Sequence, residues 1–115
     1  MTSAQSHTPE FFDCEIEPQR DTMHARLSGS LDIATSPRLR AQLAELRGFK
    51  RLVVDLSRLD FMDSSGLRLL LELDAEARQD GFALQVVPGP PAIQRVFEIT
   101  GTLQHLAFVE RGSPD

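Results

Sequence analysis

Apolar and polar residues alternate in two short runs near the start of the chain. Within 11–17 apolar residues alternate with acidic ones, and within 23–27 they alternate with His and Arg. A period of two residues is typical of a strand with one buried face. The segment 18–22 has the composition of a turn, so we predict a hairpin of two strands. Gly29 is expected to end the second strand, and 30–32 to form a loop.

Two later runs are short and apolar throughout. The segment 51–56 contains Leu-Val-Val between polar residues, and 82–87 is similarly apolar. Both patterns are typical of strands buried inside a sheet. Residues 60–63 are expected to form a loop after the first of these strands. The segment 106–109 fits either a last short strand or a helix, and the pattern does not decide between them.

Three other segments have the spacing and end signals of helices. Ser36 followed by Pro is typical of a helix start, and leucines at helical spacing follow it as far as Gly48. A second helix is expected to open at Ser64, with a broad apolar face, and to stop at Asp80-Gly81. A third is expected over 91–101. The order of elements predicts an α/β layer fold with a mixed sheet, in one domain.

Composition narrows the classes of function. The net charge is −5, and an acidic chain repels phosphate backbones, which argues against direct nucleic-acid binding. Cys14 is the single cysteine, so no internal disulfide is possible, as suits a reducing cytoplasm. The N-terminus lacks a signal pattern, and no apolar run is long enough to span a bilayer. We therefore expect a cytoplasmic protein with no membrane partner.

The most informative segment lies where the chain leaves a buried strand and enters a helix, at Asp63-Ser64-Ser65-Gly66. The first amides of a helix have no internal partner and lie at the positive end of its dipole. A phosphate on Ser64 could therefore be held there without disturbing the fold. Gly66 leaves room for the backbone of a partner. Taken alone, however, these four residues favour an ordinary helix cap.

Three blocks of the chain, taken together, favour more than a helix cap at this segment. They are 27–40, which contains Gly29-Ser-Leu-Asp32; 52–67, which contains the Asp-Ser-Ser-Gly segment; and 91–101. In this order and spacing the chain resembles the STAS family of anti-sigma factor antagonists from about Phe12 to Val109. The resemblance implies one STAS domain over 11–110, with a mixed sheet of four to five strands and helices mainly on one face. Residues 1–10 and 111–115 are expected to be tails, the first of them flexible.

The resemblance also implies a switch. Ser64 would be phosphorylated by an anti-sigma factor that is a serine kinase using ATP, and a metal-dependent serine phosphatase would reverse the modification. The unphosphorylated form would bind the anti-sigma factor and free the sigma factor. The Asp of the first block is implied to lie near the acceptor. The expected partner-binding residues are Asp32, Asp63, Ser65, Gly66, Leu67 and Arg68.

The chain departs from the family pattern at Arg68, where the family often has Gly. Ser64 and Arg68 are four residues apart, and so are neighbours on a helix face. We hypothesise that Arg68 either pairs with phosphoserine or tunes the choice of partner; an ordinary solvated arginine is the alternative. Ser30 also replaces an acidic residue that is frequent in the family loop.

Some features of the sequence could also fit functions other than this switch. Asp55, Asp60 and Asp63 could hold a metal or form an acidic phospho-acceptor site, but loop capping is favoured. A hydrolase using Ser64 or Ser65 is disfavoured because the Gly-x-Ser-x-Gly pattern is absent and no His has a clear partner carboxylate.

We expect no enzyme activity, no cofactor and no metal. A STAS scaffold or adaptor that does not switch remains the alternative, and we expect a monomer or weak dimer.

Overall fold

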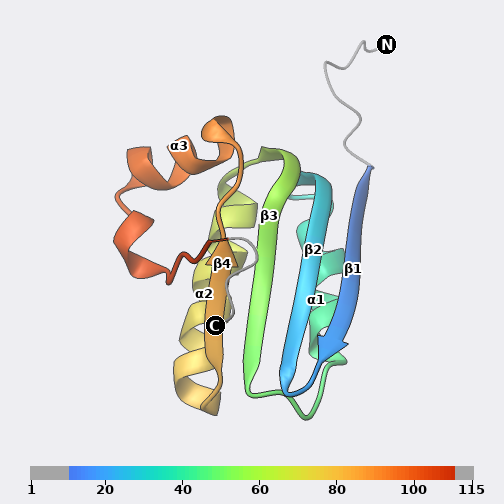
Figure 1. Cartoon of the computed structure of the whole chain (residues 1–115). Helices are drawn as coiled ribbons and strands as arrows, with labels where there is room; N and C mark the ends of the chain where they lie inside the picture. Colours follow the sequence, from blue (N-terminus) through green and yellow to red (C-terminus); the bar gives the residue numbers. More distant parts are fainter. Residues whose placement is uncertain (1–10, 111–115) are drawn as a thin grey trace.

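The sheet has four strands, and the computed structural model describes residues 11–110. The predicted tails, 1–10 and 111–115, lie outside the described residues. Strands β1 (Phe12–Gln19) and β2 (Thr22–Leu31) form the predicted antiparallel hairpin. Strand β3 (Arg51–Met62) pairs with β2 in parallel, and β4 (Ala83–Val87) pairs with β3 in parallel. The strand order β1-β2-β3-β4 gives the mixed sheet that the sequence predicts (Figure 1).

The helices alternate with the parallel strands. Helix α1 (Ser36–Ala44) links β2 to β3, and α2 (Ser64–Asp80) links β3 to β4. Both lie behind the sheet in the view of Figure 1, so they cover the same face. Helix α3 (Pro91–Thr100) follows β4 and packs against β3, and the short 3-10 helix η1 (Leu103–His105) comes after it. The predicted starts of all three helices are confirmed.

Apolar and polar residues alternate along β1 and β2, and the apolar ones lie on the face of the sheet that packs against the core. Cys14, Leu27 and Val54 belong to the face toward the core, and all three are buried. The opposite face carries charged side chains, among them Arg26, which forms an ion pair with Glu17 of the neighbouring strand. The hydrogen bond from Arg26 lowers the pKa of Glu17. One apolar and one polar face explain the two-residue period of the hairpin.

Strands β2 and β3 both run further than the sequence predicts. The expected break at Gly29 is wrong, because β2 continues to Leu31. The strand passes through Gly29, which has a φ of 88°, with a shift of register between Gly29 and Ser30. A Cβ at Gly29 would lie 2.5 Å from the carbonyl oxygen of Phe11, so only glycine fits beside that segment. The expected loop over 60–63 is also wrong for all but its last residue, since β3 stays paired with β2 as far as Met62.

Two other boundaries differ from the predictions. Helix α1 ends at Ala44, whereas the leucine spacing extended it to Gly48. The undecided segment 106–109 is neither a helix nor a full strand. Phe108 forms a single parallel bridge with Val86, and Val109 donates its amide to the Val86 carbonyl at 2.9 Å. No helix among residues 11–110 is long and apolar enough to cross a membrane.

The burial of Cys14 gives a chemical test of the fold. Burial, reinforced by the charges of Asp13 and Glu15, raises the pKa of Cys14 to about 12. The reactive thiolate is therefore scarce below that pH in the folded chain. We predict that iodoacetamide at pH 8 leaves Cys14 unmodified in the native protein and alkylates it fully in urea, as measured by intact mass. Equal rates in the two conditions would contradict the core described above.

Candidate functional site

The candidate site lies at the sheet edge where the parallel strands β2 and β3 end. Leu31 and Met62 are register partners there, and the amide of Asp63 donates to the Leu31 carbonyl at 3.2 Å. The loop into α1 and the first turn of α2 therefore leave the sheet side by side. The carboxyl ends of parallel strands are a common place for binding sites.

Asp32 organises the loop that leads into α1. Its side chain is only 5% exposed, and its Oδ1 accepts hydrogen bonds from the amides of Ala34 and Thr35, each at 3.0 Å. Thr35 in turn accepts from the Asp32 amide and donates its hydroxyl to the Ser30 carbonyl at 2.6 Å. The structure thus places Asp32 beneath the predicted contact surface, where it shapes the loop and presents little surface of its own.

Asp63 joins this loop to α2. Its Oδ1 accepts hydrogen bonds from the amides of Ser65 at 2.8 Å and Gly66 at 3.3 Å, so Asp63 is the N-cap of the helix. Its Oδ2 accepts from the amide of Ile33 at 3.3 Å, in the loop before α1. One carboxylate therefore fixes two segments that are far apart in the sequence.

Ser64 is the first residue of α2, and it is exposed. The prediction that the first amides of this helix are unpaired is wrong for Ser65 and Gly66, because Asp63 already occupies both. A phosphate on Ser64 would lie next to that carboxylate. The fold therefore leaves the Ser64 hydroxyl accessible, but it offers a phosphate fewer free donors than the sequence indicates.

Gly66 and Leu67, expected to touch a partner, are both buried. A Cβ at Gly66 would lie 2.7 Å from Met62 Cγ and 2.8 Å from the Leu31 carbonyl oxygen. Glycine is thus required by packing inside the chain, and the room inferred for the backbone of a partner does not exist. Leu67 is 7% exposed and belongs to the core. Of the predicted contact residues, Arg68 is exposed, and Asp63 and Ser65 are half-buried.

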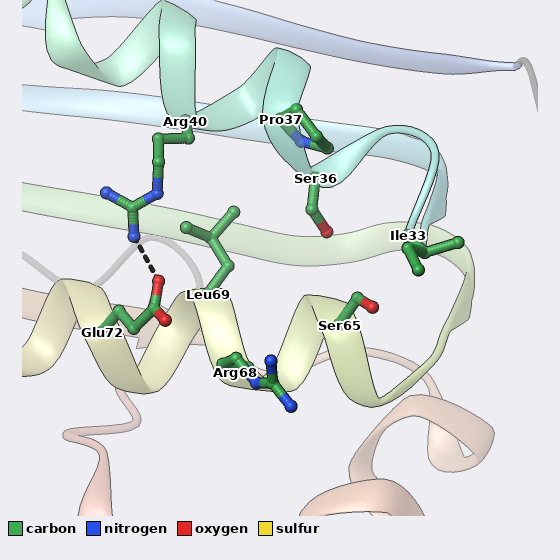
Figure 2. Close-up of a pocket in the computed structure, with 8 residues that line it drawn as sticks. All are labelled: Ile33, Ser36, Pro37, Arg40, Ser65, Arg68, Leu69 and Glu72. Carbon is green, nitrogen blue, oxygen red and sulfur yellow. Dashed lines mark hydrogen bonds and ion pairs between the residues drawn. The ribbon is translucent and has the colours of Figure 1, made fainter.

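A groove runs between α1 and α2, and Ser65, the next residue after Ser64, lines it (Figure 2). Its volume is about 280 Å³. Apolar and polar side chains from the two helices and the preceding loop line it: Ile33, Ser36, Pro37, Arg40, Ser65, Arg68, Leu69 and Glu72. The Ser36 Oγ is buried and has no hydrogen-bond partner among the described residues. Ile33, at the end of the groove, is 76% exposed.

The two arginines that line the groove differ in their ion pairs. Arg40 crosses from α1 to α2 and binds Glu72 at 2.6 Å and Glu76 at 3.0 Å. Arg68 is exposed and makes no hydrogen bond or ion pair within residues 11–110. Sequence reasoning singled out Arg68 but missed Ile33, Ser36 and Arg40. The position of Ile33, directly after Asp32 in a polar loop, was the one signal available for it.

Two of the three acidic residues that could hold a metal, Asp55 and Asp63, accept hydrogen bonds from backbone amides. Asp55 is buried, and its Oδ1 accepts from the Ser57 amide at 2.8 Å, while Asp63 caps α2. Asp60 is exposed. Within residues 11–110 no three His, Cys, Asp or Glu side chains are placed so that they could hold a metal ion.

The fold and the site together define a small α/β domain with an accessible serine and a groove at one sheet edge. The family model of the STAS domain, described as Mlab, STAS domain, matches residues 14–109. The chain therefore belongs to the STAS domain family of anti-sigma factor antagonists, which are regulatory proteins, and the resemblance found in the sequence is confirmed.

Individual relatives agree with this assignment. The anti-sigma F factor antagonist of Paenibacillus polymyxa is 36% identical over 90 residues, which cover 76% of this chain and 77% of the relative. Two solved structures of the antagonist SpoIIAA share the fold at 24% identity. The unphosphorylated form has a TM-score of 0.72, and the match covers 86% of this chain and 90% of the SpoIIAA chain. The phosphorylated form, from Bacillus, has a TM-score of 0.67, and the match covers 86% of this chain and 93% of the SpoIIAA chain.

The double role of Asp63 can be tested by substitution. We predict that Asp63→Ala lowers the free energy of unfolding by about 1–2 kcal/mol, because the helix cap and the bond to the Ile33 amide are both lost. Asp63→Asn keeps one acceptor oxygen and should cost less. Urea denaturation measures both, with Asp60→Ala, an exposed acid on β3, as the matched control. Equal stability of Asp63→Ala and the parent would show that Asp63 does not join the two segments.

Proposed function

We propose that this protein is a switchable anti-sigma factor antagonist. In its unphosphorylated form it binds an anti-sigma factor that is also a serine kinase, and a sigma factor is thereby released. Phosphorylation of Ser64 by that kinase ends the binding, and a serine phosphatase restores it. Membership of the antagonist family supports the general role, and the assignment of the switch to Ser64 is our inference.

The observation that carries the proposal is the exposure of Ser64 on a fixed backbone. The backbone on both sides of it is held, by the bonds of Asp63 to three amides before it and by the packing of Gly66, two residues after it, against Leu31. A kinase can reach the hydroxyl while the fold stays intact. The added charge of about −1.5 to −2 then appears at one point of the surface.

The same surface offers groups suited to a protein partner. Ile33 provides exposed apolar area, and Ser65 and Arg68 provide polar contacts along the groove beside it. A partner that approaches this edge with acidic groups or bound nucleotide phosphates would be repelled once Ser64 is phosphorylated. Electrostatic exclusion at a preformed surface therefore suffices for the switch.

A second candidate is a STAS scaffold that binds a partner without switching. It would use the same exposed edge but would not require a phosphorylatable residue at position 64. The two candidates differ in what happens when the protein meets a kinase and ATP.

We predict that incubation with the anti-sigma factor kinases of the source organism and ATP adds one phosphate, detected by intact mass. Ser64→Ala should abolish the gain, because the exposed hydroxyl is removed. Ser65→Ala, which removes the neighbouring half-buried hydroxyl, is the matched control and should still gain one phosphate. Phosphorylation of Ser64→Ala to the same extent as the parent would place the acceptor elsewhere. No phosphate on the parent with any of these kinases would favour the scaffold.

A further inference from the structure

Arg68 is the cation best placed to meet a phosphate on Ser64. The two residues lie one turn apart on α2, which makes them neighbours on the helix surface. Side chains in a helix point back toward its N-terminus, so Arg68 covers the turn that contains Ser64. Figure 2 shows the Arg68 side chain directed toward the Ser65 end of the helix.

The other groups at this edge leave Arg68 as the available counter-charge. Asp63 occupies the amides of Ser65 and Gly66, and its own charge repels a phosphate. Arg40, across the groove, is already held by Glu72 and Glu76. Arg68 has no such partner among the described residues. Arginine is also the side chain whose planar fork best matches phosphate oxygens.

We propose that Arg68 binds the phosphate of phosphorylated Ser64 and holds it over the mouth of the groove between α1 and α2. The inference rests on the proposed function in that Ser64 is taken as the modified residue. Because Arg68 lines the groove and Ser64 does not, the pair draws the new charge toward the groove. Phosphorylation then adds negative charge beside the groove, whose lining includes Ile33 and Leu69, and this charge repels an acidic partner.

The pairing can be measured without a kinase, using the full-length chain with phosphoserine incorporated genetically at position 64. A phosphate in contact with a guanidinium loses its last proton at lower pH, so its ³¹P titration midpoint, about 6 for free phosphoserine, falls. We expect Arg68→Gln to raise this midpoint by about 0.3–0.6 pH units relative to the parent. Repulsion from Asp63 acts equally in both proteins and cancels in the difference.

Two further variants make the result specific. Arg78→Gln removes an exposed arginine from the last turn of α2, about 21 Å along the helix from Ser64, and should leave the midpoint within about 0.1 pH units of the parent, because surface charges at that separation are screened by salt. Arg68→Lys keeps the charge but loses the fork, and should give an intermediate value. If Arg68→Gln shifts the midpoint no more than Arg78→Gln does, the proposed pairing is wrong.

The outcome separates this inference from the proposed function. A midpoint that depends on Arg68 would support the pairing even if no anti-sigma factor kinase modified the chain, in which case only the proposed function would fail. An unchanged midpoint in a chain whose Ser64 is readily phosphorylated by such a kinase would overturn the pairing and leave the switch in place.

Discussion

The arrangement of the site depends on the carboxylate of Asp63. One oxygen caps α2 through the amides of Ser65 and Gly66, and the other holds the amide of Ile33 in the loop before α1. Buried helix ends require such partners for their amides, and here a single side chain serves two segments. The accessible hydroxyl of Ser64 and the exposed side chain of Ile33 are therefore presented from one fixed edge.

This construction suits a surface that is altered by charge alone. Ser64 is exposed, and the residues that fix its backbone make their contacts inside the chain, so the proposed phosphorylation would change the surface while the fold remains. The phosphate would stand beside Asp63 in a chain that already carries a net charge of −5. The inferred role of Arg68, to bind this phosphate, fits its exposure one turn along the same helix and its lack of a partner in the described part of the chain.

The sequence predicts what local patterns determine. The hairpin, the helix starts at Ser36, Ser64 and Pro91, and the junction at Asp63 all follow from residue spacing and capping chemistry. It does not predict contacts between distant segments. Gly29 continues a strand because it pairs with Leu59 of β3, and glycine is needed at position 29 beside Phe11 and at position 66 beside Leu31. Asp32 was expected at the surface from a family pattern, but its hydrogen bonds to its own loop bury it.

In the proposed switch, a phosphate on Ser64 weakens the binding of the anti-sigma factor kinase to this surface. The most direct measurement is calorimetric titration of the anti-sigma factor kinase with the unmodified chain and with the chain that carries phosphoserine at position 64. Because like charges brought together at an interface cost several kcal/mol, the account predicts that the affinity falls at least about tenfold on phosphorylation. Equal affinity of the two forms for the kinase would contradict it.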